Sequence, residues 1–139
     1  MVLLPQNKGL VVGDLIHHNS HAWLEGGIVG GAPTPNLSAW IELLQDIKDD
    51  FSNFLPTFGG RGEVTSLKNA VDTQTNYLKV AEEIVEEYVL SVEEKESFEG
   101  ETSAAHYQKI SQLFSKEFPQ YELGYLIDYG VYGLVNSKL

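Results

Sequence analysis

The sequence predicts a protein of the α/β (α+β) class, with a small sheet near its beginning and helices in the rest of the chain. Two observations carry this prediction. Short apolar runs separated by turn residues occur early in the chain, as strands joined by turns require. Apolar residues then recur at intervals of three and four over longer stretches, which is typical of amphipathic helices. A chain of 139 residues predicts one domain.

Three short strands are expected. Val2 to Leu4 and Leu10 to Ile16 are joined by a turn at Pro5 to Gly9, so that a hairpin opens the chain. Phe54 to Phe58 is the third strand, and Gly59 to Gly62 break the chain after it. Between the second and third strands, the glycines and prolines of Glu25 to Asn36 predict a long irregular loop.

The remaining elements are helical. Helices are expected at Ser38 to Asp49, with Asn36 or Ser38 as cap, at Thr65 to Leu90 and at Ala105 to Phe114. The acidic stretch from 92 to 103 is expected to be mobile, and His106 to be exposed. The last segment, 121 to 134, has tyrosines at helical spacing, which favours packing in a core or an interface. These tyrosines are Tyr121, Tyr125, Tyr129 and Tyr132.

The charge of the chain limits its partners. A formal net charge of −11 repels phosphate backbones and anionic lipids, so we expect neither nucleic acid nor a membrane as partner. Glutamates concentrated between 82 and 101 are expected to form a solvated surface, with docking of a basic partner as the alternative. The absence of cysteine, of an apolar run long enough to span a membrane and of a secretory signal predicts a cytoplasmic protein.

The order of the expected elements indicates an incomplete layered domain. Two or three strands with helices stacked on one side make half of a layered domain rather than a whole one. Such a half exposes a sheet face and a strand edge, which favours association. We therefore predict a homodimer with an isologous interface.

Five segments in order carry a resemblance to a known family. They are VLLPQNKGLVVGD, His-Ala-Trp-Leu, LSAWIELLQDI, TFGGRGEV and TQTNYLKVAEEIVEE. Together they resemble the C-terminal half of the metallo-β-lactamase-like hydrolase superfamily. The resemblance implies half of a four-layer αββα sandwich, with a short N-terminal β-hairpin or sheet covered by about four helices. It makes 1–139 a single truncated domain, with strands, glycine-rich loop and first helix in 1–64 and a helical part in 65–139.

The resemblance also implies a zinc site, but the sequence contains few of the family's zinc-ligand residues. Asp14 matches the family's metal-bridging aspartate, whereas Arg61 stands where its last histidine is expected. The family's His-x-His-x-Asp-His motif is absent from the sequence. A hydrolytic zinc ion needs about three protein ligands and an open position. We therefore expect Asp14 and Arg61 to form a salt bridge in place of a metal site.

Three histidines after the second predicted strand support a metal site as the alternative hypothesis. His17, His18 and His21 with Asp14 provide the residue types that a divalent metal such as zinc requires. The competing expectation is that His21 forms a local hydrogen bond while His17 and His18 lie on the surface of a loop. We predict no catalytic residue and no cofactor, with zinc as the alternative.

Two classes of function follow. The first is a non-catalytic, self-associating remnant of the metallo-β-lactamase fold that binds a small molecule or a protein; the sequence does not identify the ligand. The alternative is a metal-dependent hydrolase whose site is assembled across a dimer or with a separate N-terminal half.

Overall fold

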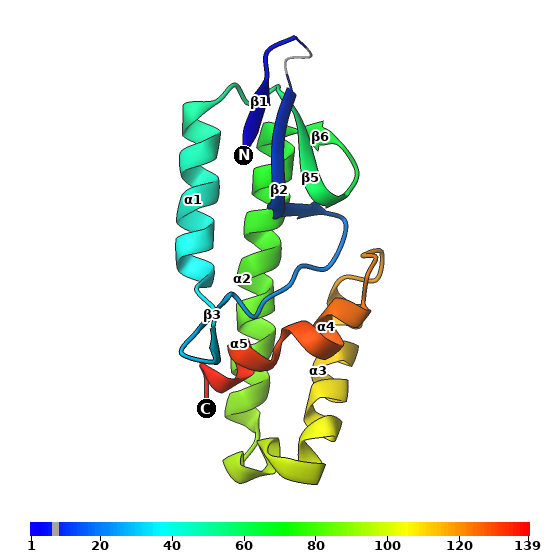
Figure 1. The fold of residues 1–139 in the computed structure, drawn as a ribbon. Helices are drawn as coiled ribbons and strands as arrows, with labels where there is room; N and C mark the ends of the chain where they lie inside the picture. The colour runs from blue at the N-terminus through cyan, green and yellow to red at the C-terminus, as the bar shows by residue number, and fades with distance from the viewer. Residues whose placement is uncertain (7–8) are drawn as a thin grey trace.

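The computed structural model describes residues 1–6 and 9–139, and it has the expected mixed composition of strands and helices. Figure 1 shows a small sheet at one end of the molecule and helices that extend away from it. The strands are β1 (Val2–Leu4), β2 (Gly9–His18), β3 (Gly27–Val29), β4 (Ala32–Thr34), β5 (Pro56–Gly62) and β6 (Thr65–Ser66). The helices are α1 (Leu37–Asp50), α2 (Leu67–Ser91), α3 (Ser103–Glu117), α4 (Tyr125–Gly130) and α5 (Tyr132–Asn136), with 3₁₀ turns η1 (Lys95–Phe98) and η2 (Gly100–Thr102).

The main sheet has four strands in the order β1-β2-β5-β6. β1 pairs antiparallel with β2, as the predicted hairpin requires, and β5 pairs antiparallel with β6. β2 and β5 are parallel, because the chain between them crosses over through β3, β4 and α1. The turn predicted at 5 to 9 includes residues 7 and 8, which lie outside the described residues.

Helices α1 and α2 pack against one face of this sheet. α2 runs behind β2 and continues well beyond the sheet (Figure 1). From α1, the Trp40 indole Nε1–H donates to the Leu15 carbonyl of β2 at 2.9 Å. Asn36 caps α1 by accepting from the Ala39 amide at 2.9 Å, which confirms one of the two predicted caps.

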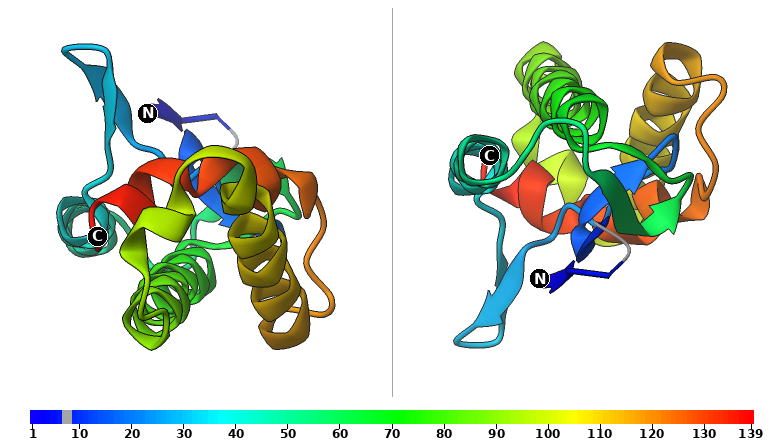
Figure 2. Two further views of the ribbon diagram at one scale, coloured as in Figure 1. Left: turned by 90° about the horizontal axis from the view of Figure 1, so that it is seen from below. Right: turned by 90° about the horizontal axis from the view of Figure 1, so that it is seen from above.

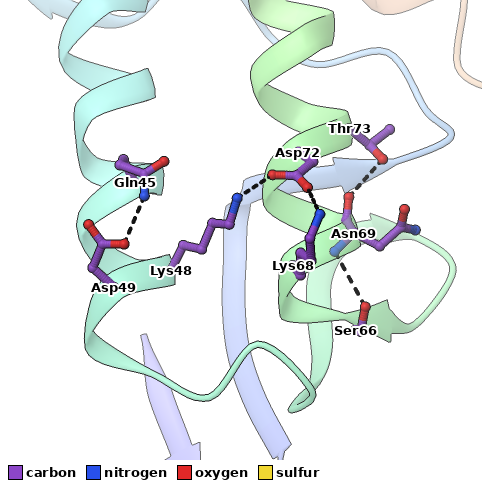
Figure 3. A network of polar contacts seen from close by, with 8 residues as sticks. All are labelled: Gln45, Lys48, Asp49, Ser66, Lys68, Asn69, Asp72 and Thr73. Atoms are coloured by element: carbon purple, nitrogen blue, oxygen red, sulfur yellow. Dashed lines mark hydrogen bonds and ion pairs between the residues drawn. The ribbon is translucent and has the colours of Figure 1, made fainter.

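An ion-pair network joins the two helices on their outer side (Figure 3). Asp72 of α2 lies between Lys48 of α1 and Lys68 of α2, with an N···O distance of 2.5 Å to each. These two ammonium groups hold the pKa of the Asp72 carboxyl below its usual value. Lys48 therefore links α1 to α2 outside the apolar core.

The far half of α2 packs with α3, α4 and α5 in a second part of the same core. Glu25, which precedes the β3–β4 hairpin, is only 5% exposed. Its carboxylate accepts a hydrogen bond from the Gly133 amide of α5 at 2.8 Å and so connects the hairpin to α5. Burial raises the pKa of this carboxyl, an effect that the backbone amides of Gly133 and Tyr132 partly offset.

The glycine-rich stretches differ from the prediction. The loop predicted at 25 to 36 contains the β3–β4 hairpin, which projects from the body of the protein in both views of Figure 2. Gly30 and Gly31, with φ values of +61° and +87°, form its two-residue turn. Gly59 to Gly62 do not break the chain but continue β5. A Cβ at Gly59 would lie 2.2 Å from the Ile16 carbonyl oxygen, so glycine permits the close approach of β5 to β2.

Two further features of the second half of the chain add to the expectations, and the mobility expected of residues 92 to 103 stays a prediction. The acidic stretch from 92 to 103 folds into η1 and η2, because Phe98 is buried and holds it against the core. His106 is not simply exposed: its ring stacks on Phe98 at 4.2 Å and contacts the hydroxyls of Tyr88 and Ser97, each at 2.9 Å. His106 thus ties η1 and α3 to α2.

The last segment forms two short helices. Its buried side chains include Leu126, Ile127, Leu134 and Val135. Of the predicted tyrosine stripe, only Tyr121 packs against the core, whereas Tyr125, Tyr129 and Tyr132 are more than half exposed. A role of these three in an interface stays a prediction.

Candidate functional site

The predicted site residues lie at the carboxyl end of the β2–β5 parallel pair. β2 does not stop at Ile16, as predicted, but continues to His18. It is irregular on the way: the register against β5 shifts on both sides of Gly13, whose φ is +57°. This irregularity turns the Asp14 side chain outward and leaves it 82% exposed.

Asp14 lies close to the imidazole ring of His17. Its carboxylate Oδ1 lies 3.6 Å from His17 Nε2 and close to the backbone of Gly60. Arg61 is exposed on the neighbouring strand and is the register partner of His17. The predicted Asp14–Arg61 salt bridge is not among the ion pairs of residues 1–6 and 9–139; the contact that the structure gives Asp14 is with His17.

His17 lies within β2 and is only 5% exposed, so it is not on the surface of a loop as expected. Its ring Nδ1 lies 3.0 Å from the His21 carbonyl oxygen, and its backbone amide donates to Gln74 Oε1 at 2.8 Å. Because a carbonyl can only accept, Nδ1 must carry the proton. The other ring nitrogen, Nε2, lies on the side of Asp14 and has no hydrogen-bond partner among the described residues.

His21 points into the core instead of joining Asp14. Only 2% of it is exposed, and aromatic rings from α2, α3 and the following turn surround it at centroid distances of 5.6–6.1 Å. Its Nδ1 lies 3.3 Å from the Tyr77 hydroxyl. The hydrogen bond expected within the local segment is therefore made to a residue distant in the sequence. Burial lowers the pKa of His21 to about 4 and keeps the ring neutral. The surrounding rings are Tyr77, Phe114, Phe118 and Tyr121.

The four candidate metal ligands are therefore divided. Asp14 and His17 lie together, His21 lies in the aromatic core, and His18 lines a separate pocket. In the described part of the chain, no three His, Cys, Asp or Glu side chains gather in a way that could hold a metal ion.

The pocket beside His18 has a volume of about 550 Å³ and a largely polar wall. His18, Asn19 and Ser20 form one side, Gly62 and Glu63 the second, and Gln120 and Glu122 the third. Backbone hydrogen bonds bring the third side to the first: the His21 amide donates to the Glu122 carbonyl at 3.0 Å, and the Glu122 amide donates to the Asn19 carbonyl at 3.1 Å.

Sequence reasoning missed most of this wall. It singled out His18, but not Ser20, Glu63, Gln120 or Glu122. The positions of Ser20 and Glu63, just after two strands, were a usable signal because parallel strands end at one edge of a sheet. Nothing in the sequence indicated that residues 120 to 122 would return to the same edge.

The second candidate surface is the face of the sheet opposite α1 and α2, which we call the open face. Val2, Val11 and Phe58 are register partners across β1, β2 and β5 and therefore share one face. Leu10, Val12 and Thr57, which alternate with them, are at most 4% exposed and belong to the helix-covered face. In the described residues no helix lies over the open face (Figures 1 and 2).

Comparison with known proteins adds no relative. The chain matches no family model, no curated protein and no solved structure. The relation to the metallo-β-lactamase-like superfamily therefore stays a prediction from the sequence. Among the described helices, none has the length and apolar character needed to cross a membrane.

Proposed function

We propose that this chain is a non-catalytic binding protein that associates with a second copy of itself through the open face of its sheet. The observation that carries the proposal is the apolar row formed by Val2, Val11 and Phe58. Val2 is 57% exposed and Phe58 is 37% exposed, whereas Leu10 and Thr57 on the opposite face of the sheet are at most 1% exposed. Contiguous exposed apolar side chains of this kind favour a protein interface.

The edge of the sheet supports the same proposal. Within residues 1–6 and 9–139, β1 pairs only with β2, so its other edge presents unpaired backbone groups. An unpaired edge beside an exposed apolar row is a template for association with another chain. The row and the edge lie next to each other, because Val2 belongs to both.

A second copy fits this surface because the surface is self-complementary. An isologous interface places the same patch of both protomers face to face, and an apolar row satisfies that condition. The net charge of −11 opposes close approach of two copies, so added salt should strengthen the dimer.

The proposal keeps the remnant of a metallo-β-lactamase-like sandwich as its structural origin, and the cytoplasm as its compartment. In that view, the partner copy takes the place of the missing layer on the open face. No specific observation favours the zinc hydrolase, because the described residues gather no set of three ligands.

Sedimentation velocity over a range of concentrations tests the proposal. The double variant Val2→Lys, Phe58→Lys places like charges opposite each other across the twofold axis, at positions where the folded monomer tolerates charge. We expect its dimer to be weakened by about tenfold or more, since facing like charges cost several kcal/mol. Leu90→Lys, at a 72% exposed position of α2, changes an apolar surface residue in the same way elsewhere and should leave the dimer intact.

A monomer at all concentrations, or equal dimerisation of the double variant, would contradict the proposal. Native mass spectrometry of protein purified with zinc tests the non-catalytic part. A metal-free dimer supports it. One zinc ion per chain that is lost in Asp14→Ala would overturn it in favour of the hydrolase.

A further inference from the structure

The pocket beside His18 lies where the strand topology favours ligand binding. His18 is the last residue of β2 and Gly62 the last of β5, and these two strands are parallel. Loops that follow adjacent parallel strands emerge at one edge of a sheet, and ligands of open α/β sheets bind outside that edge. The segment 120–122 encloses this edge from a third direction.

The charged groups in the wall are acidic. Glu63 and Glu122 come from different parts of the chain, and among residues 1–6 and 9–139 no Lys or Arg lines the pocket. Neither carboxylate takes part in an ion pair within the part of the chain that the structure describes. The net charge of −11 adds a long-range field of the same sign. The electrostatics of the pocket therefore favour a cation and disfavour an anion.

The wall also contains buried polar atoms that lack partners. Ser20 is 1% exposed, and its Oγ makes no hydrogen bond to any residue that the structure describes. The buried Nδ1 of His18 likewise has no partner among those residues. A buried polar group without a partner is costly, so native proteins retain few of them. Two such atoms in one pocket wall indicate that a bound ligand donates the hydrogen bonds that they lack.

We propose that this pocket binds a small organic cation that carries an ammonium or guanidinium group. The carboxylates of Glu63 and Glu122 neutralise the charge, and the guanidinium or ammonium N–H groups supply the donors that the wall lacks. The volume of about 550 Å³ is within the range for a small organic ligand. The proposal does not depend on self-association, since it rests on a different surface.

Amide-resolved NMR titration of the intact chain tests the proposal with two probes of nearly identical shape. Methylguanidinium carries the charge, and methylurea is its neutral counterpart. We expect methylguanidinium to shift the amides of residues 18–20, 62–63 and 120–122 to saturation, with methylurea producing no saturable shift there. Agmatine, which carries both cationic groups, should bind more tightly than methylguanidinium.

Two variants assign the binding to the carboxylates. Glu63→Gln combined with Glu122→Gln should weaken methylguanidinium binding about tenfold or more, as expected when charge-assisted hydrogen bonds are lost. Glu83→Gln, at an exposed position of α2 that does not line the pocket, removes one of the many remaining charges and should leave binding unchanged.

Three outcomes would overturn the proposal. They are equal shifts with both probes, unchanged binding in the double variant with its spectrum otherwise intact, and saturable binding of zinc at these amides without binding of either cation. The Val2→Lys, Phe58→Lys variant should bind methylguanidinium normally, which keeps this result independent of the dimer.

Discussion

The two faces of the sheet differ, although the same strands make both. On the helix-covered face, Leu10, Val12 and Ile16 are at most 4% exposed. On the open face, Val2 and Phe58 are apolar and yet exposed. A strand with one solvated face normally alternates apolar and polar residues, whereas a continuous apolar run is typical of parallel strands covered on both faces.

This difference teaches that β2 has the residues of a two-sided core strand. Leu10, Val11 and Val12 form a continuous apolar run, but helices α1 and α2 cover only one of its sides. The open face thus has the character of an interior surface, and the proposed dimer supplies its second layer. The following predictions test how different the two faces are.

The largest effect is expected on the covered face. Ile16→Ala removes a side chain that is 1% exposed and should lower the free energy of unfolding by about 3 kcal/mol, because it leaves a cavity in the core. Val2→Ala on the open face should lower it by about 0.5 kcal/mol or less under conditions where the protein is monomeric. Urea unfolding measures both, and equal losses would show that the faces are not different.

The next effect is a pH dependence that arises in the covered core. The pKa of His21 falls from 6.5 to about 4 on folding, so between these values the unfolded chain binds more protons than the folded one. Stability should therefore be fully present above pH 6.5 and decrease as the pH falls towards 4, by up to about 3 kcal/mol. Unfolding curves between these two pH values measure the decrease.

His21→Leu should remove that slope, whatever it costs in absolute stability through the loss of the Tyr77 contact. Glu25 contributes with the opposite sign: its pKa is raised on folding, so its contribution to stability decreases as the pH rises above 4.5. Glu25→Gln should accordingly make the measured slope steeper. An unchanged slope in His21→Leu would disprove the role of His21.

The smallest effect concerns the outer side of the helix layer. Lys48→Met removes the ion pair between α1 and Asp72, which is partly exposed to solvent. We expect a loss of about 0.5 kcal/mol, as is usual for such pairs, and less at high salt. Thermal unfolding at low and high salt measures it. A loss of unfolding free energy as large as that of Ile16→Ala would mean that the ion pair, and not the apolar face, keeps α1 packed against α2.

Periodicity predicted the helices well but not the irregular strand pairing. The helix expected at 38 to 49 is observed as Leu37–Asp50, and that expected at 65 to 90 as Leu67–Ser91, because local spacing defines an amphipathic helix. The glycines of β5 were interpreted as a break. Their role is to let β5 approach β2, which depends on a strand more than forty residues away.

The sequence by itself determined the class of the fold, the long helices and the acidic character of the chain. Local spacing and composition contain this information. Only the tertiary structure decided how the histidines divide: His21 enters an aromatic core, His17 faces Asp14, and His18 lines a pocket completed by Glu122. These contacts join residues 18 and 122 across most of the chain, and no local pattern defines the direction in which such side chains point.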